Sequence, residues 1–415
     1  MGNPDPSSTS KTIQTKHLAP KQVLFVTWDS PHVNYLENLF IPIFQELKER
    51  FGIQFHIVQF MWGANELIQQ RRKKFLELGI PYQAFRTSQK YPLTSLLKAV
   101  FFDTLRIKKY IKKHGIEIIM PRAVTSLAIV HGLVKNPNLK LIFDADGFPL
   151  DERVDFSGLS PLSLRYRYFR DIEFKGYQLA DSIICRSEKA KLIIASRAGA
   201  KFNDKKVFVV NNGTFKPSKL QAFTTDSNAE RCQFVYLGSS GPQYMLGEML
   251  QIFGMVKEEI GFASFRILTF QVDQVKEFIQ EKFPTLYSVV EVRTVSPDEV
   301  MGELENADFG ISFRTPSFSV QGVAPIKISE YLSAGLNVIY NSGTGDVETL
   351  LEGKDFAFCI HDFSPTHHPE LIQWVKMKLG KNQRKEVRDF AASNFSLERI
   401  SLTYQKVIQY ASGIK

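Results

Sequence analysis

One short segment, residues 324–335, contains a lysine and a glutamate whose spacing could bind a nucleotide. Pro325 at the start and Gly335 at the end predict a short helix, with Pro325 at its first position and a buried strand after it. Lys327 and Glu330 are three residues apart, so they share one helix face near the helix N-terminus. Free N–H groups and the Lys327 charge would bind a diphosphate, and the Glu330 carboxylate would accept a hydrogen bond from a ribose hydroxyl. The alternative is an exposed Lys–Glu ion pair.

A second candidate phosphate site is a turn of small residues between a predicted strand and a predicted helix. The turn consists of Gly238, Ser239, Ser240 and Gly241. Small side chains let backbone N–H groups approach phosphate oxygens, although many glycine turns are only connections. If this turn faces the helix that Pro325 begins, the two segments form one phosphate site. Fixed dipoles and Lys327 would then stabilise a departing nucleotide diphosphate without a metal ion.

Strands that alternate with helices must position these residues. In the first half of the chain the predicted strands are 22–27, 53–60, 82–86, 116–120, 141–144, 181–186 and 207–210. In the second half they are 234–237, 265–268, 289–292, 309–313, 336–340 and 356–360. Helical stretches separate them, apart from an irregular stretch expected between the strand 141–144 and a helix at 164–179. Strands and helices in this order predict right-handed crossovers and parallel sheets covered on both faces.

The length of 415 residues suits two domains. We expect an α/β protein with two doubly wound, Rossmann-like domains that face each other across a cleft. The predicted parts are a flexible tail (1–20), a first domain (21–213), a linker (214–230), a second domain (231–390) and a C-terminal helix that packs toward the first domain (391–415). Ligands of such sheets bind where the carboxyl ends of the strands meet.

Composition restricts the kind of partner. The net charge of +9 belongs to the first half, since residues 1–214 contain 32 Lys and Arg against 19 Asp and Glu. Two helical stretches, 70–74 and 106–113, hold much of this charge. They predict contact with an anionic membrane surface or substrate, or else they are solvated helix faces whose apolar residues point into the core. Nucleic acid is not expected, because no aromatic stacking platform accompanies the bases.

The same composition sets expectations for location and metal content. The three cysteines are unclustered, and no apolar run reaches the length of a membrane span, so a soluble, cytoplasmic protein is expected. Asp144 and Asp146 have the spacing of an Asp-x-Asp metal motif, but the strand before them would bury the first carboxylate. A metal site is therefore not expected.

Taken in order, several motifs resemble those of retaining glycosyltransferases with the GT-B fold. The resemblance extends over most of residues 140–345. The matching segments are Asp144–Arg153, Gln178–Glu188, Val207–Gly213, Tyr236–Gly241, Val295–Val300 and Asn306–Gly310. It implies an enzyme that moves a sugar from a nucleotide-diphosphate sugar, with a UDP-sugar slightly favoured, to a glycan or lipid-linked glycan in surface polysaccharide or glycoconjugate biosynthesis. The basic first domain adds the expectation of peripheral contact with the inner face of the membrane.

The resemblance assigns roles to individual residues. The donor would be bound by Gly238, Ser239, Ser240, Gly241, Thr294, Val295, Pro325, Ile326, Lys327 and Glu330. Catalysis would involve Lys327, Asp146 and Arg314. The acceptor would meet His32, which follows the first strand, together with Glu152 and Arg153, which follow a central strand. Attack on the same face as the leaving group would need no side-chain nucleophile.

Two departures from the family pattern leave alternatives open. Many relatives carry a sugar-contacting glutamate eight positions before the ribose-binding one, where this chain has Gly322. They also often have an Arg and a Lys shortly after the glycine turn, and residues 241–247 contain neither, so Arg314 would have to compensate. A nucleotide-sugar 2-epimerase on the same scaffold and a binding protein without catalysis are therefore alternatives. A dinucleotide oxidoreductase and a serine hydrolase are not indicated, since their glycine motifs are missing.

Overall fold

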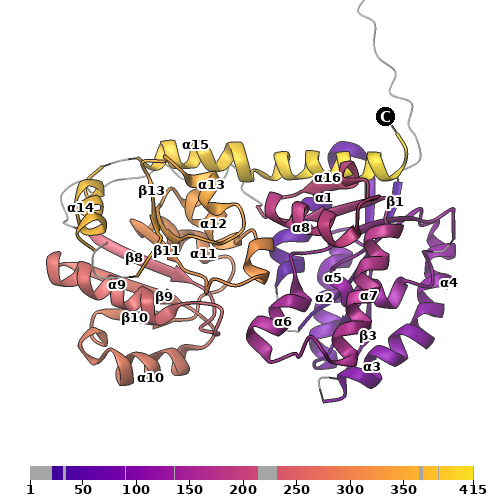
Figure 1. Ribbon diagram of the computed structural model, residues 1–415, viewed down its shortest axis with the longest axis horizontal. Helices are drawn as coiled ribbons and strands as arrows, with labels where there is room; N and C mark the ends of the chain where they lie inside the picture. Colours follow the sequence, from indigo (N-terminus) through magenta and orange to yellow (C-terminus); the bar gives the residue numbers. More distant parts are fainter. Residues whose placement is uncertain are drawn as a thin grey trace, which may run out of the picture.

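The computed structural model describes residues 21–30, 34–88, 90–134, 136–213, 231–363, 368–381 and 383–414. These residues form two α/β domains that lie side by side (Figure 1). The first contains a seven-stranded sheet and the second a six-stranded sheet, and apolar clusters of helix and strand residues cover both faces of each. The predicted fold class is confirmed. The expected tail and linker lie outside the described residues.

The first domain has the strand order β3-β2-β1-β4-β5-β6-β7, and neighbouring strands are parallel. The strands are β1 (Lys21–Trp28), β2 (Ile53–Met61), β3 (Tyr82–Arg86), β4 (Ile118–Pro121), β5 (Lys140–Asp144), β6 (Ser182–Cys185) and β7 (Val207–Val209). The helices are α1 (Ile41–Phe51), α2 (Asn65–Glu77), α3 (Pro92–Lys98), α4 (Thr104–His114), α5 (Ala123–Val130), α6 (Pro149–Ser157), α7 (Leu164–Leu179) and α8 (Glu188–Ala198). Short π-helical segments precede α1 and α4, at Leu36–Phe40 and Ala99–Asp103.

The second domain has the order β10-β9-β8-β11-β12-β13, again with parallel neighbours. The strands are β8 (Cys232–Leu237), β9 (Ala263–Leu268), β10 (Val290–Arg293), β11 (Phe309–Ser312), β12 (Asn337–Asn341) and β13 (Ala357–Ile360). The helices are α9 (Leu246–Glu259), α10 (Val272–Lys282), α11 (Val300–Glu305), α12 (Ile326–Ala334), α13 (Val347–Leu351), α14 (His368–Lys378), α15 (Arg384–Phe395) and α16 (Leu397–Ala411). A 3₁₀ turn, Ser319–Gly322, precedes α12.

Strand order reverses at one point in each sheet, between β1 and β4 and between β8 and β11. At such a point the loops after neighbouring strands diverge and leave a crevice at their carboxyl ends. Asp29 and Arg122 follow β1 and β4, while Gly238 and Arg314 follow β8 and β11. The topology therefore places the predicted phosphate turn and Arg314 at the same crevice.

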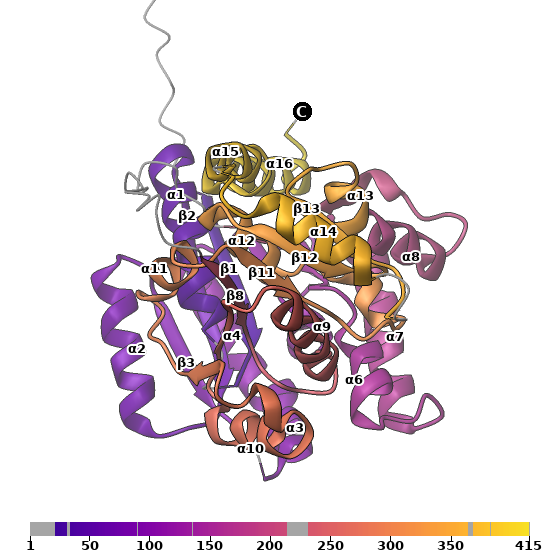
Figure 2. The ribbon, with the colours of Figure 1, turned by 90° about the vertical axis from the view of Figure 1, so that its left-hand side faces the viewer.

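Two C-terminal helices join the domains along one side. In Figure 1 α15 runs over the second domain and α16 continues over the first, and Figure 2 shows both nearly end-on. α15 contacts α12, and α16 contacts α1. Apolar residues of α16, including Leu397, Tyr404 and Ile408, belong to the same buried cluster as residues of β1 and α1. The residues that follow the second domain thus complete the core of the first.

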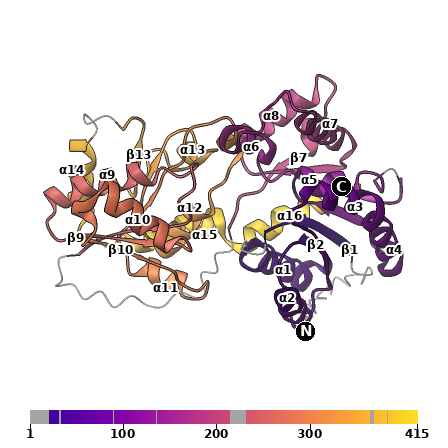
Figure 3. The ribbon, with the colours of Figure 1, turned by 90° about the horizontal axis from the view of Figure 1, so that it is seen from below.

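Two local predictions were wrong. Residues 149–157, expected to be irregular, form α6. Pro325 is the residue before α12 and has extended backbone angles, so it is not the first helical position. Pro325 still begins the segment, because its ring fixes φ and the helix starts directly after it. Figure 3 shows α6 at the junction of the two domains, where it contacts the turn Ser319–Gly322.

Among the residues that the structure describes, none of the helices combines the length and the apolar character needed to cross a bilayer.

Candidate functional site

Lys327 lies in the first turn of α12, and its ammonium group faces the loop after β8. Nζ donates to Tyr236 Oη at 3.2 Å and lies 3.7 Å from the ring centroid of Tyr244. Burial lowers the pKa of Lys327 well below its usual value, Arg314 lowers it further, and Glu330 opposes both. An anion bound beside Nζ would therefore favour the charged form of this lysine.

Gly238 allows this lysine to approach the loop. It has a φ of +154°, and a Cβ at this position would lie 2.3 Å from Lys327 Nζ and 2.9 Å from Tyr236 Oη. Tyr236 Oη in turn donates to the carbonyl of Ser239 at 2.7 Å. Gly241, in the same turn, has open space around it. Only one of the two glycines is therefore required by close packing.

Arg314 follows β11 and shares an aromatic ring with Lys327. Its guanidinium carbon lies 4.6 Å from the ring centroid of Tyr244. Its backbone is fixed by Asn341, whose amide accepts from Arg314 N at 2.7 Å and donates to Arg314 O at 2.9 Å. Within the described part of the chain, Arg314 Nε and Ser240 Oγ are buried without a hydrogen-bond partner. Unpaired buried polar atoms reduce stability, so they are typical of groups that bind a ligand.

Glu330 lies one turn further along α12, and its side chain is partly buried. Burial raises its pKa to about 7, while Lys327 acts in the opposite direction. Lys327 is partly buried as well, so the two residues do not form the exposed surface pair of the alternative. The Glu330 carboxylate remains available to accept a hydrogen bond.

The first domain presents a buried group of alternating charges at the carboxyl ends of β1, β4, β5 and β6. Arg122 pairs with Asp29 at 3.0 Å and with Asp146 at 2.6 Å. Arg186 binds both oxygens of Asp144, at 2.6 and 2.8 Å. Asp146 has a left-handed backbone with a φ of +53° and is the most exposed of the three carboxylates, at 23%. Unusual backbone geometry of this kind is often found at functional sites.

Groups from both domains interact electrostatically across the cleft. Burial raises the pKa of Tyr35 to about 12, and Tyr244 of the second domain raises it as well, whereas Arg122 and Arg314 lower it. Burial raises the pKa of Glu152 in α6, and Arg314 opposes this effect. Asp146 and Glu152 of the first domain therefore lie close to Arg314 of the second domain, which in turn lies close to Lys327.

The structure also shows where the other predicted donor-binding residues lie, namely Thr294, Val295, Pro325 and Ile326. Thr294 and Val295 follow β10, two strands from Gly238, and Thr294 Oγ1 donates to the carbonyl of Thr269 at 2.8 Å. Pro325 is buried, and the side chain of Ile326 packs against the core of the first domain.

Two predicted acceptor residues remain. Arg153 in α6 is half-buried, and burial together with Arg165 lowers its pKa. His32 lies outside the described residues.

Gly322 lies at a close contact between the domains. A Cβ on Gly322 would lie 2.6 Å from the ring of Phe148 and 3.2 Å from Gly147 Cα. The ring of Phe148 is also 5.9 Å from that of Phe318, centroid to centroid. Hydrogen bonds reinforce this contact, with Ser187 Oγ donating to Gln321 O at 2.7 Å. In this arrangement of the domains, the site where relatives have a glutamate cannot accept a side chain.

The possible metal ligands either pair with arginine side chains or lie away from Lys327. Asp144 and Asp146 are both paired with arginine, as described above. A group of three possible ligands, Glu348, Cys359 and His361, has its donor atoms within 4.8 Å of one another. These residues belong to α13 and to the end of β13, and none of them contributes to the space around Lys327.

Sequence reasoning missed four residues of the site: Tyr35, Arg122, Tyr236 and Tyr244. Arg122 directly follows β4, so the prediction of that strand could have identified it. The two tyrosines beside Lys327 flank the glycine turn, and Tyr244 lies in the segment 241–247, where the resemblance led us to look for cations. Their role depends on which way each ring points, and strand or helix periodicity carries no information on ring direction.

No protein-family model and no curated protein sequence matches the chain. Solved structures do match it. HepE from Anabaena in complex with UDP and glucose has a TM-score of 0.67 at 13% identity, covering 94% of this chain and 99% of HepE. A glycosyltransferase from Rickettsia africae has a TM-score of 0.66 at 15% identity, covering 96% and 100%. A TarM variant from S. aureus in complex with Fondaparinux, alpha-GlcNAc-glycerol and UDP has a TM-score of 0.64 at 11% identity, covering 93% and 99%. The chain therefore has the GT-B fold of these glycosyltransferases.

Proposed function

We propose that this protein transfers a sugar from a nucleotide-diphosphate sugar to a glycan or lipid-linked glycan, with retention of configuration and without a metal ion. The observation that carries the proposal is the convergence of Lys327, Arg314 and the Gly238 turn at the crevice of the second domain, opposite Asp146. The solved structures support the class of donor, since HepE is in complex with UDP and with UDP-glucose. We therefore favour a UDP-sugar.

The roles follow from charge and position. The diphosphate would lie between the N-terminus of α12 and the Gly238 turn, where Lys327 and Arg314 stabilise the negative charge that develops as the sugar departs. Glu330 would accept a hydrogen bond from the ribose. Thr294 and Val295, at the end of β10, would contact the base.

The first domain would bind the reacting sugars. Asp146 and Glu152 would contact hydroxyl groups of the sugars, and Arg153 and His32 would complete the acceptor side. The leaving phosphate would take the proton of the acceptor hydroxyl, so no side-chain nucleophile is needed. The saccharides in the TarM complex support a glycan as the acceptor.

Thermal unfolding in the presence of UDP-, GDP-, ADP-, dTDP- and CMP-sugars tests the donor, because a ligand of the folded state raises its melting temperature. Lys327→Ala should weaken binding of the best donor by roughly 10- to 100-fold, the effect of losing a hydrogen bond to a charged group. Lys276→Ala, on the exposed side of α10, is the matched control and should bind normally. Normal binding and turnover by Lys327→Ala would refute the site.

Two product assays separate the alternatives. Incubating the donor without an acceptor would reveal an epimerase as a change in the sugar itself. With an acceptor, NMR of the product gives the anomeric configuration, and inversion would contradict the proposed retention. A donor that binds but does not react with or without an acceptor would support the alternative of a binding protein without catalysis.

Peripheral membrane contact is the second part of the proposal. Phe101 and Phe102, in the π-helical segment Ala99–Asp103, are 67% and 68% exposed, and Leu105, in the first turn of α4, is 58% exposed. Exposed basic side chains surround them at Lys98, Arg106, Lys108, Lys109, Lys112 and Lys113. Ile107 is buried, and Val100 and Ile111 are partly buried against the core, so the stretch has both a core face and an exposed apolar one. A cationic surface with exposed aromatic rings fits an anionic lipid bilayer.

Sedimentation with vesicles of phosphatidylglycerol and phosphatidylcholine tests this contact. Phe101→Ser with Phe102→Ser should reduce vesicle binding while leaving the melting temperature unchanged, since both rings are exposed. Phe270→Ser is the matched control, because that ring is 74% exposed on the second domain. Absence of binding to anionic vesicles at low salt would exclude the contact.

A further inference from the structure

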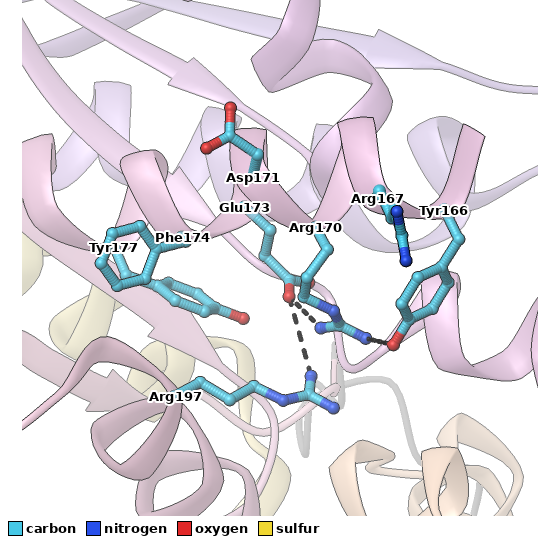
Figure 4. A pocket seen from close by; sticks show the side chains of 8 residues that line it. All are labelled: Tyr166, Arg167, Arg170, Asp171, Glu173, Phe174, Tyr177 and Arg197. Atoms are coloured by element: carbon cyan, nitrogen blue, oxygen red, sulfur yellow. Dashed lines mark hydrogen bonds and ion pairs between the residues drawn. The ribbon is translucent and has the colours of Figure 1, made fainter. Parts of the chain in front are cut away.

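A cavity of about 420 Å³ lies in the first domain, beside α7 and α8. It is lined by Tyr166, Arg167, Arg170, Asp171, Glu173, Phe174, Tyr177 and Arg197 (Figure 4). All of these residues belong to α7 except Arg197, which belongs to α8. None of them has a role in the proposed transfer reaction.

The buried and half-buried charges of this cavity are balanced, and the two other charged residues of its lining, Arg167 and Asp171, are exposed and opposite in sign. Arg170 donates to Asp151 at 2.7 Å and to Tyr166 Oη at 2.7 Å, and it also pairs with Glu173. Arg197 binds both oxygens of Asp151, at 2.9 and 3.0 Å, and lies 3.7 Å from Glu173. Two guanidinium groups thus meet two buried carboxylates. A charged ligand would upset this balance, whereas a neutral ligand would find both donors and acceptors.

Aromatic side chains form the other part of the lining. Phe174 is 45% exposed, and Tyr177 is fully buried. The Tyr177 hydroxyl is buried and has no hydrogen-bond partner in the part of the chain that the structure describes. Figure 4 shows it pointing into the space toward Glu173 and Arg197. An unpaired hydroxyl reduces the stability of the fold, and one that points into a cavity can gain a hydrogen bond from a molecule bound there.

We propose that this cavity is a second binding site, for a neutral saccharide. The C–H face of a sugar ring would pack on the aromatic side chains, and its hydroxyl groups would pair with Tyr177 Oη, Glu173 and Arg197. A neutral polyhydroxylated ring matches the balanced charges better than a phosphate or an amine. The choice of a saccharide over another polyol rests on the proposed function, while the site itself does not.

The cavity is connected to the cleft through α6 and Arg197. Asp151 of α6 pairs with the cavity arginines, and the next residue, Glu152, interacts with Arg314 in the cleft. Arg197 Cζ lies 4.9 Å from the ring centroid of Phe148 and 5.0 Å from that of Phe318, which belongs to the second domain. A bound saccharide would therefore affect the contact between the domains.

Saturation-transfer NMR with maltose, cellobiose, lactose and chitobiose tests the site in the full chain. The wild type should bind at least one of them saturably. Phe174→Ala should weaken that binding roughly tenfold through the lost ring contact, and Tyr177→Phe should weaken it about fivefold through the lost hydroxyl. Leu192→Ala is the control, because this residue is 70% exposed on α8 and outside the lining.

The variants also distinguish a ligand site from a structural role. Tyr177→Phe should melt at the same temperature as the wild type or higher, since it removes an unpaired buried hydroxyl. Failure of all four disaccharides to bind, or equal binding by Phe174→Ala and the wild type, would overturn the proposal. UDP binding, measured in parallel, should stay unchanged in these variants; if the wild type does not bind UDP, the proposed function fails while the saccharide result stands.

Activity assays identify the source of the saccharide. If it is a remote unit of the acceptor, Phe174→Ala should raise KM for a long acceptor and leave KM for a short one unchanged. If it is a separate regulatory sugar, added disaccharide should change the turnover of the wild type and leave that of Phe174→Ala unchanged. Either outcome supports the site, and a Phe174→Ala enzyme equal to the wild type in both assays contradicts it.

Discussion

Two glycines in one turn should respond very differently to the same substitution. Gly238→Ala introduces a Cβ 2.3 Å from Lys327 Nζ and 2.4 Å from its Cε, at a φ of +154° that side chains rarely adopt. Gly241→Ala introduces the same atom into open space. Comparing Gly238→Ala with Gly241→Ala therefore separates the effect of the contact with Lys327 from the general effect of replacing a glycine.

The cost follows from the geometry. Overpacking costs about 1–3 kcal/mol, and the strained backbone adds a contribution of about 1–3 kcal/mol. The flexible end of Lys327 can move away and relieve part of the clash, but it then loses its place beside the turn. Loss of a hydrogen bond from a charged group, worth about 1.5–3 kcal/mol, corresponds to roughly 10- to 100-fold weaker binding of UDP. Gly241→Ala should change stability by about 0.5 kcal/mol or less.

Isothermal titration with UDP and thermal unfolding without it measure the two effects. Gly238→Ala should show both, and Gly241→Ala neither. The double variant Gly238→Ala with Lys327→Ala should bind UDP as weakly as Lys327→Ala alone, because both substitutions remove the same interaction. If Gly238→Ala binds UDP as well as Gly241→Ala does, Lys327 does not contact the diphosphate and the reasoning is refuted.

Three further predictions concern buried charge and the domain contact. Burial raises the pKa of Glu330 to about 7, so the native state holds this proton more tightly than the unfolded chain, and stability should fall by up to about 3 kcal/mol as pH rises from about 4.5 to 7. Denaturant unfolding across this range should show a smaller decline for Glu330→Gln, and parallel curves would contradict the assignment. Asp144→Ala leaves Arg186 buried without its carboxylate and should lower the free energy of unfolding by about 3–5 kcal/mol in the same assay. A decrease of less than about 1 kcal/mol would show that water replaces the lost carboxylate. Gly322→Glu should not restore the family pattern but separate the domains at Phe148, which small-angle scattering would detect as a larger radius of gyration.

Much of the fold could be predicted because strands and helices differ in their periodicity. The strand Tyr82–Arg86 and the helices Leu164–Leu179 and Glu188–Ala198 begin and end where the pattern predicted. Strong local signals explain this agreement, including a serine before each of these two helices, Ser163 and Ser187, whose side chain accepts from the first turn.

The missed helix α6 shows where the same reasoning failed. Its start and stop signals are present, with Pro149 in the first turn, two acidic residues after it and Gly158 in the left-handed conformation at its end. Its apolar periodicity is weak because consecutive charged residues, Asp151 and Glu152, interact with arginines, Asp151 with Arg170 and Arg197 and Glu152 with Arg314. A helix with polar contacts of this kind does not have the apolar stripe by which helices are usually recognised.

The sequence by itself determined the two-domain architecture and the positions of Lys327, Glu330 and the glycine turn in it, because strand and helix periodicity and Gly and Pro signals act over a few residues. Only the tertiary structure decided that Lys327 rests on the rings of Tyr236 and Tyr244 and that Arg314 joins it there. It also decided that Phe148 and Gly147 of the first domain occupy the space that a side chain at position 322 would need. These features depend on which side chains meet across strands and domains, and such contacts join residues far apart in the chain that no local pattern relates.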